Sequence, residues 1–122
     1  MRRIAEDRAS SPAEVIPQLF EAAAEWFEAD GFRGCSYLNA AVEITDQSHP
    51  ALRVVRGYLD SVGEQLGELA ATLGLPYPES SGRQLQVLLG GAIGQALAYH
   101  SVAPFATARD AAMRVLGFPA GT

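Results

Sequence analysis

Lysine is absent from this sequence of 122 residues, and its nine Lys and Arg positions are all arginines. The formal net charge is −5 at pH 7, so the chain lacks the positive surface that binding to a phosphate backbone requires. It also lacks an apolar run of the ~20 residues that span a membrane, and no apolar segment follows the basic start as in a signal peptide. We therefore expect neither nucleic acid nor a membrane among the partners of this chain.

Cysteine is nearly absent as well. The single Cys35 excludes a disulfide within the chain and suits a reducing cytoplasm, where we expect the protein to reside. Hydrophobic residues make up 48% and charged residues 19% of the sequence, which excludes a disordered composition. The length is that of one domain with one core.

Apolar residues recur every three or four positions along most of the chain, the spacing typical of α-helices. Ser11 and Pro12 have the residue types of a helix start, and Gly31 marks a stop. Pro17 interrupts this pattern, because it removes a backbone donor. We expect a break or kink near Ile16, with the regular helix running over residues 16–29.

The middle of the chain predicts a short helical segment over residues 38–43 and then one long helix. Between them lies a polar break, in which Ser48 is the expected cap of the long helix. The apolar residues of the long helix are spaced alternately three and four positions apart, so they form one face of the helix, which ends before Gly74. These apolar residues are Leu52, Val55, Leu59, Val62, Leu66, Leu69 and Leu73.

The next helix, expected from about residue 79 or 81 to Tyr99, is apolar nearly all round. Between Gln86 and His100 only Gln95 is strongly polar, so this helix must be covered on all sides. Its glycines cost ~1 kcal/mol each in helix propensity, which indicates a tight helix–helix contact. A last helix follows after residues 101–103 and ends at Gly117, and the short connection favours an antiparallel hairpin.

So short a chain has too few helices to cover the all-round apolar one, so we expect a homodimer through the last two helices. The expected interface comprises Leu89, Gly90, Ile93, Gly94, Leu97, Phe105, Ala108, Ala112 and Leu116. The fold class is all-α, an antiparallel bundle of about five helices. Residues 1–11 are a flexible N-terminal arm or the end of a linker helix, residues 12–118 form the domain, and residues 119–122 are a tail.

Catalytic and metal-binding patterns are poor. His49 and His100 lie at helix ends and have no Cys, His or carboxylate neighbours at metal-ligand spacing. Cys35 has no base beside it in the sequence, so packing is its favoured role. We expect no enzymatic activity, no catalytic residues, no cofactor and no metal.

Aromatic residues are the feature that stands out among otherwise aliphatic helices. They either fill the core or line an apolar pocket between helices, in which Asn39, Gln95 or a tyrosine hydroxyl would orient a ligand. Both interpretations stay open at this point. The candidate ligand-binding residues are Phe20, Trp26, Phe27, Phe32, Tyr37, Asn39, Tyr58, Val62, Leu66, Leu88, Gln95 and Tyr99.

Residues 26–43 carry a resemblance to a known family. The run from Gly31 to Glu43, GFRGCSYLNAAVE, is similar to the stretch G-F-R-G-C-P-F-L-N-A-A-x-E of the C-terminal domains of bacterial TetR-family transcriptional regulators. His49-Pro50 opening a long helix and the run LLGGAI over residues 88–93 also resemble that family, and the similarity spans roughly residues 12–117. Ser36 and Tyr37 depart from the usual proline and phenylalanine.

The resemblance implies an all-helical domain that dimerises through its last two helices and encloses a pocket for a small apolar or aromatic effector. In a full-length regulator the effector would relieve DNA binding, which belongs to a helix-turn-helix unit of ~50 residues that this chain lacks. The chain is then an engineered truncation, a fragment or a naturally short relative. The alternatives are a free-standing helical module that heterodimerises with a regulator and a small helical enzyme.

Overall fold

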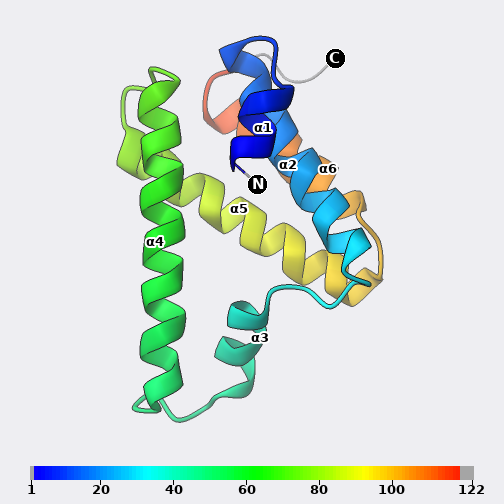
Figure 1. Cartoon of the computed structure of the whole chain (residues 1–122), viewed down its shortest axis with the longest axis vertical. Helices are drawn as coiled ribbons and strands as arrows, with labels where there is room; N and C mark the ends of the chain where they lie inside the picture. The colour runs from blue at the N-terminus through cyan, green and yellow to red at the C-terminus, as the bar shows by residue number, and fades with distance from the viewer. Residues whose placement is uncertain (1, 119–122) are drawn as a thin grey trace.

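The computed structural model describes residues 2–118, and these fold into six α-helices without a strand among them (Figure 1). The all-α prediction is confirmed. The predicted tail, residues 119–122, lies outside the described residues. The helices are α1 (Arg2–Arg8), α2 (Pro12–Ala29), α3 (Ser36–Glu43), α4 (Pro50–Thr72), α5 (Pro78–Tyr99) and α6 (Ala103–Val115).

Helix α5 joins the two halves of the molecule. It packs on α4 on one side and on α6 on the other, while α2 covers α6 and α1 lies on α2 (Figure 1). Helix α3 packs on α4, below α5 in the view of Figure 1. Within one chain α5 packs on α4 and α6 and touches α2, an arrangement that buries Leu85, Ala92 and Ala96 but leaves Val87, Leu97 and Tyr99 exposed.

The core lies where α2, α4, α5 and α6 meet. Its largest fully buried side chains include Phe20 and Phe27 of α2, Leu85 of α5 and Phe105 of α6. The ring centroids of Phe27 and Phe105 are 5.7 Å apart, which fixes α2 against α6. Each such side chain contributes about 1.5–3 kcal/mol by leaving water.

Helix α2 corrects the expected break at Pro17. It is one helix from Pro12 to Ala29, with Pro17 inside it. Val15 and Ile16, at 7% and 0% exposed, directly precede the proline and anchor this turn in the core. Their burial offsets the one backbone hydrogen bond that Pro17 cannot donate.

The start of α4 corrects the expected cap. His49, not Ser48, is the N-cap residue, because Pro50 occupies the first helical position. The Ala51 amide donates to His49 Nδ1 at 3.0 Å. Ser48 instead donates its amide and its hydroxyl to Asp46 Oδ1, at 3.0 and 2.7 Å, and so closes the preceding turn.

The tight contact predicted from the glycines of α5 is present, at a glycine other than those expected. A Cβ atom added to Gly82 would lie 2.5 Å from the Gly67 nitrogen of α4, so the two backbones nearly touch. Next to it, Gln86 Nε2 donates to the Leu59 carbonyl at 2.6 Å. A Cβ at Gly91 or Gly94 would meet nothing within 4 Å.

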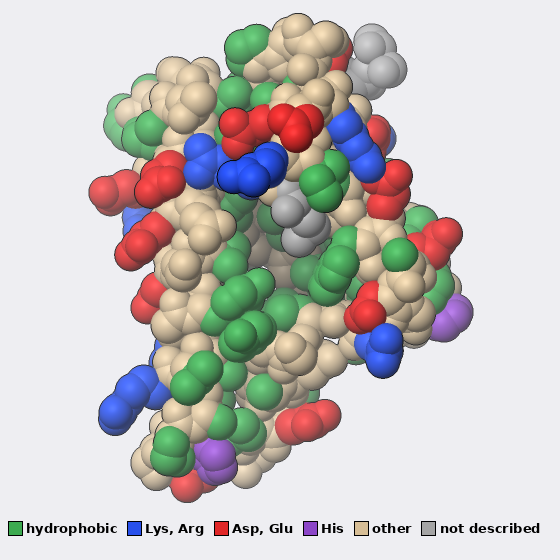
Figure 2. Space-filling model, viewed as in Figure 1, with side chains coloured by type: hydrophobic (Ala, Val, Ile, Leu, Met, Phe, Trp, Pro, Cys, Tyr) green, Lys and Arg blue, Asp and Glu red, His purple; other side chains and the backbone are tan. Residues whose placement is uncertain are grey.

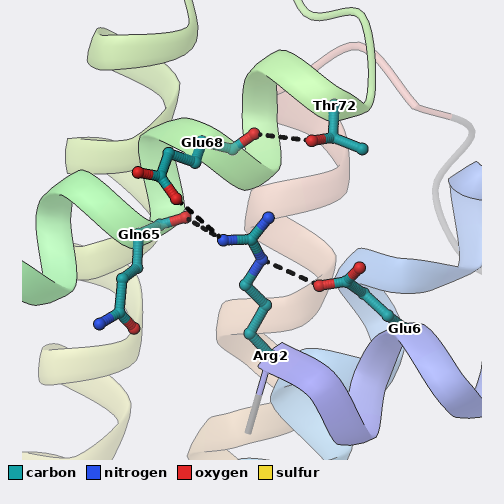
Figure 3. Close-up of polar contacts among 5 residues, drawn as sticks. All are labelled: Arg2, Glu6, Gln65, Glu68 and Thr72. Carbon is teal, nitrogen blue, oxygen red and sulfur yellow. Dashed lines mark hydrogen bonds and ion pairs between the residues drawn. The ribbon is translucent and has the colours of Figure 1, made fainter.

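Residues 2–8, left open as an arm or a helix end, form α1. Its Ala5 is fully buried, and Arg8 pairs with Glu25 of α2. Figure 3 shows Arg2 reaching from α1 to α4, where it donates to the Gln65 carbonyl at 3.4 Å and meets Glu68 at 3.3 Å. Such exposed ion pairs contribute roughly 0–1 kcal/mol each.

Candidate functional site

The loop between α2 and α3 carries three residues in the left-handed region of the backbone. Gly31, Phe32 and Gly34 have φ values of 72°, 61° and 79°. Glycine adopts this conformation freely, but for Phe32 it costs roughly 1–2 kcal/mol. The Phe32 ring offsets this cost by an edge contact to Phe27, with centroids 5.2 Å apart, and a stack on His100 at 4.1 Å.

A second aromatic contact joins α3 to α4. The rings of Tyr37 and Tyr58 are stacked with centroids 3.9 Å apart and planes inclined by 9°. Burial raises the pKa of the Tyr58 hydroxyl, and the neighbouring Cys35 and Tyr37 raise it further, because each would add a negative charge when ionised. The sequence showed the two tyrosines and the cysteine, but not that they lie together.

Asn39 closes the loop before α3. Its Nδ2 donates to the Arg33 carbonyl at 3.0 Å, so this amide group already has a partner within the chain. A Cβ atom on the buried Gly34 would lie 3.8 Å from Asn39 and 3.8 Å from Ile93 Cγ2 of α5. Asn39 therefore positions the loop over α5, whereas we expected it to orient a ligand.

A groove of about 710 Å³ runs between α5 and α6. Small side chains form much of it, and the aromatic ring of the exposed Tyr99 lies at one end. Past Val87 and Leu88 it continues to Ser80, Arg83, Gln84 and Val115. The residues lining the main groove are Val87, Leu88, Gly91, Ala92, Gln95, Tyr99, Ser101, Ala103, Pro104, Thr107, Ala108 and Ala111.

The lining of the main α5–α6 groove contains no charged side chain, although the chain as a whole carries a net charge of −5. A second groove, of about 660 Å³ between α4 and α5, differs sharply. It is lined by Asp60, Glu64, Glu68 and Glu79 against the single cation Arg83. Two copies of an acidic chain can meet at the first groove without bringing like charges together.

The candidate ligand-binding residues do not form one pocket. Phe20, Phe27 and Leu66 are core residues, at most 4% exposed, and Phe32, Val62 and Leu88 are half-buried against that core. Tyr37 and Tyr58 meet between α3 and α4, while Gln95 and Tyr99 belong to the α5–α6 groove with Leu88. Trp26 is 37% exposed and touches Phe27 edge-on.

The residues of the expected dimer interface also lie in different parts of the structure. Phe105 and Ala112 are 2% and 0% exposed within this chain, so they offer no surface to a second copy. Gly90 and Ile93 face the α3 region, since a Cβ on Gly90 would lie 4.0 Å from Leu38 Cδ1. Among the remaining members, Leu89 and Leu116 are half-buried against the core, Gly94 and Leu97 are exposed, and Ala108 lies in the groove.

The sequence could not distinguish the faces of α5, because the helix is apolar nearly all round. Periodicity locates a helix face by contrast between apolar and polar residues, and α5 has little contrast. The face beside α6 in fact carries Leu88, Gly91, Gln95 and Tyr99, which the interface prediction omitted. Gln95, as the one polar residue of that stretch, was the available signal for an open face.

The two histidines make contacts within the fold. His49 caps α4 and His100 stacks on Phe32. Within residues 2–118, no cluster of three or more His, Cys, Asp or Glu side chains has a geometry suited to a metal ion. None of the helices in this same range is long and apolar enough to cross a membrane.

Hydrophobic side chains gather on the face between α4 and α2, where the surface is hollowed (Figure 2). The charged residues of this view lie mainly around its edge, including a mixed cluster of arginines and acids above the hollow (Figure 2). An apolar hollow rimmed by polar groups is the usual setting of a small-molecule site.

No protein-family model, curated protein or solved structure matches the chain. Function therefore has to be inferred from its own residues.

Proposed function

We propose that this chain is the effector-binding and dimerisation domain of a TetR-like transcriptional regulator, and that two copies pair through α5 and α6. The proposal is supported by the GFRGCSYLNAAVE motif, by the all-helical fold and by the groove between the last two helices. The observation that carries it is the groove itself, which is uncharged and built from small residues.

Gly91, which lines the groove, is the residue that points to a partner there. It lies in the interior of α5, where glycine costs ~1 kcal/mol relative to alanine. The chain itself does not need a glycine at this position, since a Cβ there would meet nothing within 4 Å. A helix of a second copy packed against this face is the contact that would exclude larger side chains there.

The effector would be small and apolar or aromatic. The hollowed apolar face between α4 and α2 and the stacked Tyr37 and Tyr58 supply the surface for such a molecule. In the full-length regulator the effector would favour one of two spacings of the DNA-binding units. A coupling of about 1–3 kcal/mol between effector and DNA would suffice.

A matched pair of glycine variants tests the dimer. Gly91→Glu places a carboxylate in the α5–α6 groove, whereas Gly57→Glu places one on an open face of α4, where a Cβ also meets nothing within 4 Å. We expect light scattering to show a monomer for Gly91→Glu and a dimer for Gly57→Glu. A Gly91→Glu variant that stays dimeric would contradict pairing through this groove.

The effector is tested by screening a library of apolar and aromatic compounds for a rise in melting temperature. A genuine ligand at 100 times its Kd stabilises the folded chain by about 2.7 kcal/mol. The half-exposed Trp26 provides a second readout, because a ligand that covers its ring would protect its fluorescence from quenching. Failure of every apolar compound, with binding only of charged ones, would contradict the proposed effector class.

A further inference from the structure

Helix α3 is the least embedded element of the fold. None of its residues is buried, whereas each of the other five helices within residues 2–118 buries at least one side chain. Its main partner is α4. A helix with so little burial contributes little to the core and can move without unfolding the rest.

Two aromatic stacks hold this helix in place. Tyr37 stacks on Tyr58 of α4 with ring centroids 3.9 Å apart, and Phe32, just before α3, stacks on His100 after α5. Toward α5 itself the contact is slight, with Leu38 near Gly90 and the buried Gly34 near Ile93.

The segments that flank α3 can absorb a rotation. Gly31, Phe32 and Gly34 already have positive φ values on the side of α2. On the side of α4, residues 44–49 form an exposed turn apart from the half-buried Ile44. Hinges are short segments of this kind, which take up changes in φ and ψ while the helices stay rigid.

We infer that α3 is a lid, hinged at residues 31–34 and latched by the Tyr37–Tyr58 stack, that admits an apolar ring-containing ligand to the face of α5 around Gly90 and Ile93. Opening separates Leu38 from Gly90 and exposes the half-buried Ile93 beside it. It also frees the faces of Tyr37 and Tyr58, which can then stack on a ring of the ligand. The inference rests on the proposed effector-binding function and describes how the effector enters its site.

Hydrogen exchange of the chain without any ligand tests the lid. We expect the amides of residues 36–43 to exchange at least about tenfold faster than those of α5, because α3 opens locally. Tyr58→Ala removes the latch and should speed exchange in α3 by a further two- to tenfold, roughly what one aromatic pair contributes. Tyr58→Phe keeps the stacked ring and is the matched control, with exchange in α3 as in the wild type.

Two results would overturn the lid. One is exchange in α3 as slow as in α5 in the wild type, which means that α3 opens only with the whole domain. The other is a Tyr58→Ala variant in which α4 and α5 accelerate as much as α3. Neither result depends on a ligand or on the dimer, so failure of the lid and failure of the proposed function are separate outcomes.

Ligand entry is measured with N-phenyl-1-naphthylamine, an uncharged aromatic dye whose fluorescence rises in apolar surroundings. In stopped-flow mixing, we expect Tyr58→Ala to bind the dye two- to tenfold faster than the wild type, in the same range as the exchange effect. Tyr58→Phe should bind it at the wild-type rate. Equal association rates for all three proteins would contradict gating by this latch.

Discussion

Trp26 and Phe27 are neighbours in the sequence but have different roles in the fold. Phe27 is fully buried and contacts Phe32 and Phe105, whereas Trp26 is 37% exposed. Helical periodicity places both near the apolar side of α2 and cannot rank them, because the edge of a helix face is set by the neighbouring helices. The sequence therefore singled out the aromatic residues but could not tell which of them form the core.

This difference predicts unequal costs of truncation. Phe27→Ala should lower the free energy of unfolding by about 3–5 kcal/mol, because it leaves a cavity at the centre of the core. Trp26→Ala should cost less, about 1–2 kcal/mol, since part of the ring is already in water. Urea unfolding of both variants measures the two values, and equal losses would show that Trp26 is a core residue.

The raised pKa of Tyr58 predicts that the stability of the fold changes with pH in the alkaline range. Its pKa lies above the ordinary value of 10.0, so the folded chain holds this proton more tightly than the unfolded chain does. The resulting stabilisation is complete below pH 10.0 and is lost as the pH rises through the pKa of the folded state.

The absorbance at 295 nm of the wild type minus that of Tyr58→Phe isolates this titration. We expect a difference step centred above pH 10.0. We also expect the wild type to lose stability faster than the variant above that pH. A step at or below pH 10.0 would mean that the Tyr58 hydroxyl is not shielded by α3.

At the scale of elements, the sequence located the long helices well and their contacts less well. The stripe from Leu52 to Leu73 predicted α4 because its apolar and polar residues are well separated. The crossing of α4 and α5 at Gly67 and Gly82 was missed, because Gly82 lies outside the glycine-rich stretch and a close approach needs a partner helix to be recognised.

The α4–α5 crossing predicts opposite effects for two glycine substitutions. Gly82→Ala should destabilise the chain by about 1–3 kcal/mol, because its Cβ would lie 2.5 Å from the backbone of α4. Gly57→Ala, in the open on α4, should instead stabilise by up to ~1 kcal/mol through helix propensity. Thermal unfolding compares them, and a Gly82→Ala variant as stable as the wild type would contradict this crossing.

Helix α2 provides a second comparison, between two prolines. Pro17→Ala restores a backbone donor inside the helix and should raise the free energy of unfolding by about 1–3 kcal/mol. Pro12→Ala, at the first helical position, should change it by less than about 0.5 kcal/mol, because no hydrogen bond is missing there. Similar values for the two would indicate that the regular part of α2 begins only near Ile16, as the sequence suggested.

At the scale of the whole molecule, the spacing of apolar residues predicted an all-helical chain, and the structure agrees over residues 2–118. The predicted dimer face moved from one side of α5 to the other, toward Gly91 and Gln95. The reason is that α3 and the loop before it lie over Gly90 and Ile93, and neither contact can be seen in a one-dimensional pattern. The uncharged groove beside α6 is open, and it is the surface through which we propose that two copies pair.

The mass of the chain in solution tests this account most directly. Sedimentation equilibrium at micromolar concentration should give twice the 12.9 kDa of one chain. Raising the salt from about 0.1 M to about 1 M should leave that mass unchanged, because the main groove contains no charged side chain to be screened. A mass of 12.9 kDa under these conditions would contradict the central claim that two copies pair through α5 and α6.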